Sequence, residues 1–340
     1  MKKLNISIIG VGHLGKIHTK LWAQNAAVNL VGVFDINQQK AKEVAAEFGC
    51  RAFGSLRELI QSTDAVTIAS DTKSHFKLAK KMLENKIHCL IEKPITATYA
   101  ESKKLIKIAE ENKSLVQVGH VERFNPALVA VKKYDLDPLF IEAHRLSQFR
   151  PRAIDVSVVH DLMIHDIDII LWLIKSPVKR IDANGVAILT NTPDIANARI
   201  EFKNGAIANI TASRISANSL RKFRIFQRDA YFSIDFGNQK VDMFKILDGK
   251  LDPNKYPLAF NLGSILDIPE PKSIVYEQPE IPKLNAIEEE QNSFVESILA
   301  SKPIAVTAYE AMNAVRIAEI ITRQIEKNLK KLKKQILIDN

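Results

Sequence analysis

Short apolar runs alternate with longer amphipathic segments over residues 1–122 of the chain. The runs are rich in Val, Ile and Leu, which is typical of strands buried on both faces of a parallel sheet. The segments between them have apolar residues at helical spacing. We expect strands at 4–9, 29–34, 65–69, 87–91 and 115–118, and helices at 16–26, 38–48, 74–85 and 99–112. This alternation predicts an α/β domain built on a doubly wound parallel sheet.

The second part of the chain, residues 123–340, reads mostly as strands and turns. Expected strands lie at 139–146, 180–189, 196–202, 206–213, 223–227, 231–236 and 240–246. Asn204-Gly205 separates two of them and is a strong signal for a tight hairpin. We therefore predict an α+β domain with a large, mostly antiparallel open sheet. Few helices remain to cover this sheet, so we expect a homodimer or homotetramer to bury its apolar face.

One helix interrupts these strands, at His160–Ile174. Apolar residues occupy most of its sides, so we expect it to be buried. Residues four apart share a helix face, so Asp161 and His165 project together, with Asp168 one turn further on. Buried ionisable groups are costly unless they are paired or used in chemistry. The segment is thus a candidate catalytic site, with a satisfied polar contact as the alternative. A metal site is not expected, because His160 and His165 lie about 140° apart around an α-helix.

Composition narrows the class of protein. With 340 residues, 46% of them hydrophobic, the chain is long enough for two cores. No apolar run reaches the length of a membrane span, and His13 and Lys16 interrupt the N-terminal run. We therefore expect a cytoplasmic protein. Cys50 and Cys89 provide no disulfide framework. Six of the thirteen prolines lie within 253–282, where we expect irregular chain.

The net charge of +9 is not accompanied by a recognised nucleic-acid-binding motif, so no nucleic-acid partner is expected. Part of the charge lies in the tail 323–340, which holds six Lys or Arg against two acids. Leu329, Leu332, Ile336 and Leu337 add an apolar component to this tail. We interpret it as a solvated helix end, with contact to an anionic membrane as the alternative.

A glycine-rich motif, Gly10-x-Gly12-x-x-Gly15, follows the first strand and opens the first helix through His13 and Leu14. In this position the first glycine permits a tight turn, the second lets the backbone approach a pyrophosphate, and the third allows close helix–strand packing. The N–H groups at the start of the helix favour an anion. The motif predicts a Rossmann domain that binds a dinucleotide.

The strand that follows ends in Asp35, the position where a carboxylate binds the adenosine ribose hydroxyls of NAD. The same charge repels the 2′-phosphate of NADP. Ile36, Asn37 and Gln38 come next, so no arginine is available to bind such a phosphate. NAD is therefore the expected cofactor.

Polar residues also follow two later strands. Ser70 and His75 come after the strand at 65–69, and Glu92 and Lys93 after the strand at 87–91. Ligands of open parallel sheets bind beyond the carboxyl ends of the strands. We therefore expect these side chains beside the cofactor, with Lys93 near the nicotinamide ring. A solvated lysine is the alternative.

These motifs together resemble the glucose-fructose oxidoreductase/inositol dehydrogenase family, often written Gfo/Idh/MocA. The resemblance is carried by Gly10–Gly15, the Ser70–His75 turn, Glu92-Lys93-Pro94 and Asp161-x-x-x-His165. It covers nearly the whole chain. One departure is Asp71, where the family usually carries proline or asparagine.

The resemblance implies an NAD-dependent oxidoreductase that acts on a secondary alcohol. Lys93, Asp161 and His165 would surround the carbon that gives up the hydride. His165 would remove the hydroxyl proton, since histidine is the side chain most often used as a general base. Lys93 would stabilise the developing alkoxide, and Asp161 would orient the imidazole or bind a neighbouring hydroxyl.

Segments 118–126, 141–147 and 161–168 resemble the UDP-N-acetylglucosamine 3-dehydrogenase branch of that family. This resemblance implies oxidation at C3 of the sugar nucleotide, for the 3-amino sugars of lipid A. Arg123, Arg145, Arg150 and Arg152 lie around these segments, and guanidinium groups suit a diphosphate. Solvated surface arginines are the alternative. Two other functions stay open: an inositol, free-sugar or polyol dehydrogenase, and a non-catalytic NAD-sensing regulator.

Overall fold

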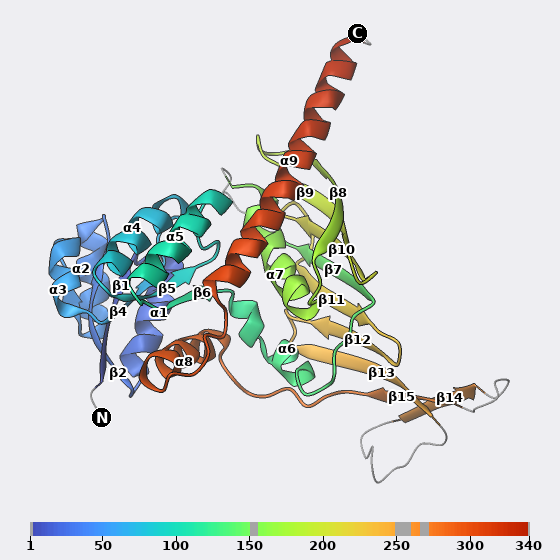
Figure 1. The fold of residues 1–340 in the computed structure, drawn as a ribbon, viewed down its shortest axis with the longest axis horizontal. Coiled ribbons are helices and arrows are strands. Elements are labelled where there is room, and N and C mark those ends of the chain that lie inside the picture. Colours follow the sequence, from blue (N-terminus) through green and yellow to red (C-terminus); the bar gives the residue numbers. More distant parts are fainter. Residues whose placement is uncertain (1–2, 150–155, 249–259, 266–271, 339–340) are drawn as a thin grey trace. The chain divides into compact units, whose positions relative to one another are not determined.

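The computed structural model describes residues 3–149, 156–248, 260–265 and 272–338 (Figure 1). The chain divides into two compact units. The first unit contains residues 1–124 and 285–316, and the second contains 125–284 and 317–340. The first segment of the first unit ends at Phe124, two residues beyond the domain boundary that the sequence predicted at 122. Residues 285–316, which the sequence analysis placed in the second domain, return to the first unit.

The first unit is built on a six-stranded parallel sheet with helices between the strands. Its strands are β1 Leu4–Ile9, β2 Val28–Phe34, β3 Arg51–Ala52, β4 Ala65–Ile68, β5 His88–Glu92 and β6 Val116–Gly119. Its helices are α1 His13–Gln24, α2 Gln38–Phe48, α3 Leu56–Ser62, α4 Thr72–Glu84, α5 Tyr99–Glu111, the 3-10 turn η1 Val121–Phe124, and α8 Ala286–Leu299. The strand order is β3-β2-β1-β4-β5-β6. This order confirms the predicted Rossmann topology. The short β3, α3 and η1 were not predicted, and α8 comes from outside the predicted first domain.

The core of the first unit explains why the chain returns to it. Trp22 of α1 is almost fully buried, and its indole N–H donates to Thr67 Oγ1 at 2.9 Å. Phe294 and Val295 of α8 belong to the same apolar cluster as β1 and α1. The Val118 N–H at the sheet edge donates to the carbonyl of Val306 at 3.1 Å. The returning segment therefore fills the core and pairs with the edge strand β6.

The second unit is built on a nine-stranded sheet. Its strands are β7 Phe140–Leu146, β8 Val178–Val186, β9 Ile195–Phe202, β10 Ile207–Ser213, β11 Leu220–Phe226, β12 Ala230–Asp235, β13 Lys240–Asp248, β14 Phe260–Ile265 and β15 Lys272–Glu277. They are ordered β14-β15-β13-β12-β11-β7-β10-β9-β8. All neighbouring pairs are antiparallel except β7 and β10. The structure confirms the predicted open, mostly antiparallel sheet. The expectation of irregular chain over 253–282 was wrong for β14 and β15, which pair despite the nearby prolines.

Side chains alternate between the two faces of this sheet. On β7, Ile141 and Ala143 are fully buried, and helices α6 Pro126–Val131 and α7 Ile164–Leu173 pack on that side. The opposite face carries Phe140 of β7 and its cross-strand neighbour Phe226 of β11, which is 37% exposed. The sheet thus has one helix-covered face and one aromatic outer face.

The long helix α9, Ala308–Ile338, closes the chain. In the second unit its side chains reach the edge strand β8, where Gln324 Nε2 donates to the carbonyl of Ile181 at 2.8 Å. The basic residues predicted at a helix end do lie on this helix. Among the described residues, no helix has an apolar stretch long enough to cross a bilayer.

Candidate functional site

The glycine loop between β1 and α1 is shaped by close backbone contacts. Gly10 has φ +89°, a left-handed conformation that favours glycine, and a Cβ there would lie 2.7 Å from the backbone nitrogen of Ser70. A Cβ on Gly15 would lie 1.9 Å from the carbonyl oxygen of Gly10. A Cβ on Gly12 would meet nothing within 4 Å. Two glycines therefore pack the loop, and Gly12 keeps open the space that a pyrophosphate would need.

The first turn of α1 adds an anion site to this loop. Gly12 is the N-cap and has no side chain to bond the helix N–H groups. His13 and Leu14 begin the helix, where the N–H groups lack partners within the helix and the dipole is positive. This geometry suits a dinucleotide phosphate.

Asp35 lies at the end of β2, next to the glycine loop. Its Oδ2 accepts the Val11 N–H at 2.8 Å and its Oδ1 accepts the Asn37 N–H at 2.9 Å. The carboxylate is thus fixed beside the loop, and each oxygen retains a further lone pair. The neighbouring Ile36 is 91% exposed, an unusual state for a large apolar side chain. In the sequence, Ile36 served only to show that no arginine follows Asp35, although an apolar residue directly after that aspartate was a usable signal.

His75 of α4 joins the loops that follow β4 and β5. Its Nδ1 lies 2.9 Å from the carbonyl oxygen of Pro94, and its Nε2 lies 2.9 Å from that of Ser70. Ser70 Oγ also lies 2.7 Å from Ser74 Oγ. Asp71, the residue that departs from the family pattern, is the exposed N-cap of α4 and makes no side-chain cap bond. The loop carrying Lys93-Pro94 is therefore held by a buried imidazole.

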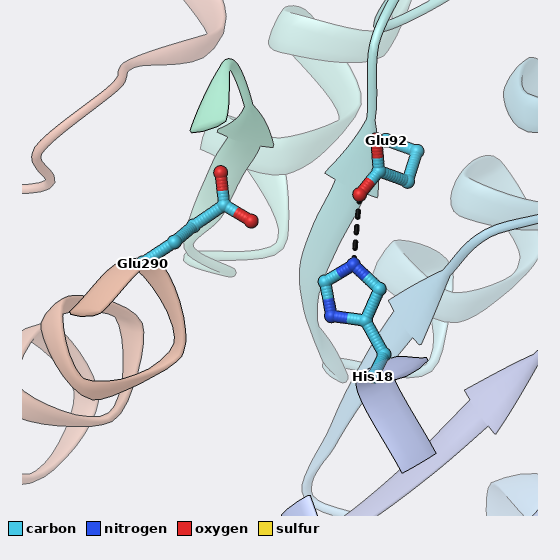
Figure 2. A group of neighbouring side chains, drawn as sticks. All are labelled: His18, Glu92 and Glu290. Carbon is cyan, nitrogen blue, oxygen red and sulfur yellow. Dashed lines mark hydrogen bonds and ion pairs between the residues drawn. The ribbon is translucent and has the colours of Figure 1, made fainter. Parts of the chain in front are cut away.

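Glu92 supports Lys93 from the other side of this loop. The Lys93 N–H donates to Glu92 Oε2 at 3.3 Å. The other carboxylate oxygen, Oε1, accepts from Nε2 of His18 on α1 at 2.8 Å, and both side chains are largely buried (Figure 2). The expected residues Ser70, His75, Glu92 and Lys93 therefore belong to one connected group in the first unit. His18 was not predicted, because no local pattern in the sequence links it to Glu92.

Asp161 and His165 lie in the second unit, where the helix contains an unexpected π-helical turn. This turn, η2 Val159–Met163, runs directly into α7. It has i→i+5 hydrogen bonds, so the face-sharing rule for an α-helix does not hold over its length. Asp161 and His165 are half-buried and Asp168 is buried. Single π turns are frequent at functional sites. Local spacing gives no signal for such a turn.

His160, also on the π turn, faces α9. Its Nδ1 lies 3.5 Å from Thr322 Oγ1. Burial lowers the pKa of His160, and the nearby Glu319 offsets part of that effect. This half-buried imidazole makes a contact between two helices of the second unit.

Two of the four predicted substrate arginines are engaged by acids. Arg145 of β7 donates from Nε to Asp166 Oδ2 at 3.0 Å and from Nη2 to Oδ1 at 2.9 Å, and both side chains are buried. Arg123 of η1 donates to Glu310 of α9 at 3.3 Å. Arg150 and Arg152 lie outside the described residues.

Comparisons with known proteins give a consistent result. Residues 4–120 match an oxidoreductase family described by an NAD-binding Rossmann fold, and residues 136–232 match the GFO/IDH/MocA C-terminal domain. UDP-N-acetylglucosamine 3-dehydrogenase of Acidithiobacillus ferrooxidans is 36% identical over 89% of this chain and 91% of that protein. Its crystal structure matches with a TM-score of 0.85, covering 96% of this chain and 99% of that one.

More distant relatives act on other polyols and sugars. The scyllo-inositol 2-dehydrogenase (NAD(+)) of Bacillus subtilis is 30% identical over 63% of this chain and 68% of that protein. A levoglucosan dehydrogenase in complex with NADH and levoglucosan superposes with a TM-score of 0.80 at 20% identity. The latter likeness shows the fold alone.

Proposed function

Because this chain belongs to the Gfo/Idh/MocA oxidoreductase family, we propose that it is an NAD-dependent dehydrogenase of UDP-N-acetylglucosamine. The reaction is oxidation of the C3 hydroxyl to a ketone. The observation that carries this proposal is the 36% identity, over most of both chains, to a UDP-N-acetylglucosamine 3-dehydrogenase. Inositol dehydrogenases match a smaller share of the chain and are the alternative.

The choice of NAD over NADP rests on Asp35. Its carboxylate is fixed by two backbone N–H groups beside the glycine loop and can accept ribose hydroxyls. A 2′-phosphate in the same place would bring two negative charges together. The exposed Ile36 provides an apolar surface next to the ribose position, suited to the adenine ring.

Three side chains carry the proposed chemistry. When bound, NAD would supply the acceptor for the hydride that leaves the alcohol carbon. His165 removes the hydroxyl proton as the hydride leaves. Lys93 stabilises the negative charge that develops on the oxygen. Asp161 orients the imidazole or binds a neighbouring hydroxyl of the sugar.

The arginines divide into two groups under this proposal. Arg145 and Arg123 are held by buried or half-buried acids, so we assign them to the support of the elements that carry the site. Arg150 and Arg152 are kept as candidates for the diphosphate, on the chemistry of the guanidinium group alone.

The product also suggests a place in a reaction sequence. A 3-keto sugar nucleotide is the substrate that an aminotransferase needs to form a 3-amino sugar. We propose that this amino sugar is used in lipid A synthesis.

We further propose that the protein is a homo-oligomer that uses the outer face of the large sheet. A row of aromatic rings crosses five neighbouring strands there, with ring centroids 4.6–5.7 Å apart. Its members are Phe140, Phe226, Tyr231, Phe244 and Tyr276. Aromatic surface of this kind is enriched at protein interfaces.

The test is a substrate panel with the purified protein. The panel contains UDP-N-acetylglucosamine, scyllo-inositol, myo-inositol and glucose 6-phosphate, each offered with NAD and with NADP. Formation of NADH or NADPH is followed by absorbance. We expect turnover with the sugar nucleotide and NAD. Mass spectrometry should identify the product as the 3-keto sugar nucleotide. Turnover of an inositol but not of the sugar nucleotide would overturn the substrate. NAD binding without turnover of any of these compounds would support the alternative of a non-catalytic NAD-sensing regulator.

A further inference from the structure

Behind the Lys93 loop, the first unit holds a buried cluster that the proposed mechanism does not use. It consists of His18 of α1, Glu92 of β5 and Glu290 of α8 (Figure 2). Each residue has one atom that could bind a metal ion, and these three atoms lie within 4.8 Å of one another. The side chains come from segments far apart in the sequence, and the return of α8 to the first unit completes the cluster.

The hydrogen bonds assign the proton of His18. Gln291 Nε2 donates to Nδ1 of His18 at 3.1 Å and to the carbonyl of His18 at 3.2 Å. Because Nδ1 accepts, the ring proton lies on Nε2 and donates to Glu92 Oε1. With its proton on Nε2, the ring has no Nε2 lone pair for a metal ion.

Glu290 is fully buried, with an exposed fraction of 0%. Neither of its carboxyl oxygens has a hydrogen-bond partner in the part of the chain that the structure describes. An ionised carboxylate is not stable in such a place without a partner. Burial and the charge of Glu92 both raise the pKa of Glu290 well above its usual range.

Other ionisable groups near α8 do not contribute to the raised pKa of Glu290. Among the described elements, α1 contributes His18 and η1 contributes Glu122 and Arg123 to the surroundings of α8. β6 contributes the uncharged Gln117, whose Nε2 donates to the carbonyl of Glu290 at 2.8 Å. Arg123 pairs with Glu310. Of all these groups and Glu92, only the Glu92 charge contributes to the raised pKa of Glu290.

We propose that Glu290 is a neutral carboxylic acid in the working enzyme and acts as a positioning residue for Lys93 through Glu92. A proton on Glu290 leaves Glu92 as the single anion of the cluster. Glu92 then keeps the hydrogen bonds of both His18 and the Lys93 backbone. Ionised Glu290 would place a second negative charge beside Glu92 and loosen the Lys93 loop. The inference rests on the function proposed for Lys93.

The test compares Glu290→Gln, a neutral isostere, with Glu290→Ala and with Glu289→Gln. Glu289 is the exposed neighbour on the same helix and provides the matched control. Infrared spectra of the wild type should contain the band of a protonated carboxylic acid that Glu290→Gln lacks and Glu289→Gln retains. This readout requires neither substrate nor turnover.

The pH dependence of unfolding gives the second readout. A carboxyl group whose pKa is raised on folding costs stability as the pH rises above its ordinary value of about 4.3. The melting temperature of the wild type should therefore fall, relative to Glu290→Gln, between about pH 5 and pH 8. The assignment of Glu290 as a neutral acid would be overturned if the melting temperatures of the wild type and Glu290→Gln changed in parallel with pH. It would also be overturned if the wild type lacked the infrared band of a protonated carboxylic acid. A rise in melting temperature on adding Zn²⁺ that Glu290→Gln abolishes would overturn it as well, because that result indicates a metal ligand.

Kinetics test the positioning role separately. Glu290→Gln should keep kcat within about threefold of the wild type at neutral pH, while Glu290→Ala loses on the order of tenfold or more from a displaced Lys93. Because ionisation of Glu290 would loosen the Lys93 loop, we expect kcat of the wild type to decline at alkaline pH and kcat of Glu290→Gln not to show this decline. Equal activity of both variants would overturn the positioning role and leave the dehydrogenase proposal intact.

Discussion

The glycines of the loop between β1 and α1 are not equivalent, although the sequence motif contains glycine at each of these positions. Gly15 is required because its α-carbon lies against the carbonyl of Gly10, so any Cβ would clash with backbone. Gly12 has φ −60° and faces open space, so the folded chain itself tolerates a side chain there. The fold therefore requires a glycine at position 15 and leaves position 12 free for a ligand to require one.

Alanine substitutions separate these tasks. Gly15→Ala should destabilise the protein by about 1–3 kcal/mol or more, as expected for overpacking. Gly12→Ala should leave the melting temperature nearly unchanged and weaken NAD binding by more than about tenfold, since the methyl group occupies the space of the pyrophosphate. Thermal unfolding and NADH fluorescence titration provide the two readouts. Tight NAD binding by a well-folded Gly12→Ala variant would contradict the assignment of the loop.

At the residue scale, the sequence can place a candidate residue in the fold only where the signal is local. The glycine motif, Ser70, His75, Glu92 and Lys93 all lie at or just beyond the carboxyl ends of strands that the sequence predicted, with His75 in the first turn of α4 and Glu92 as the last residue of β5. Partners distant in sequence were not predictable. Gln291 and His18 are 273 positions apart, and nothing in either local pattern indicates the contact.

Among the elements, the helix after β7 departs most from expectation. The sequence predicts an α-helix over His160–Ile174, and α7 confirms its presence. Its first turn is π-helical, so the expected side-by-side placement of Asp161 and His165 cannot be derived from α-helical spacing. Asp166, which the sequence analysis did not use, anchors this helix to β7 through the buried pair with Arg145.

Charge removal from this pair tests its role. Arg145→Met alone should cost about 3–5 kcal/mol of unfolding free energy, because Asp166 is left buried without its partner. The double variant Arg145→Met/Asp166→Leu should recover much of that loss. Urea denaturation measures both. If Arg145→Met kept full stability and only raised KM for the sugar nucleotide, Arg145 would be a substrate ligand after all.

For the whole molecule, the sequence predicted both sheets and the change of class between the two halves of the chain. It did not predict the return of 285–316 to the first unit, because tertiary packing of Phe294 and the pairing of Val306 with β6 decide that path. The sequence also predicted that one face of the open sheet is apolar, but not that a row of aromatic rings crosses it. Burial of that row between copies of the chain is the physical reason to expect an oligomer.

A charge placed in the aromatic row should disrupt assembly. Phe226→Asp introduces a carboxylate at a position that is 37% exposed, so the subunit should still fold. We expect light scattering to show a lower molar mass than for the wild type. Leu299→Asp, at a 50% exposed position in the first unit, is the matched control and should not change the mass. An unchanged oligomer in Phe226→Asp would place the interface elsewhere.

The most direct measurement is hydride transfer from UDP-N-acetylglucosamine to NAD by the wild type, Lys93→Ala and His165→Ala. The account predicts NADH formation by the wild type and a loss of kcat on the order of 10²–10⁴ in either variant. Lys77→Ala, an exposed lysine of α4, should behave as the wild type. Near-wild-type turnover in either Lys93→Ala or His165→Ala would contradict the account.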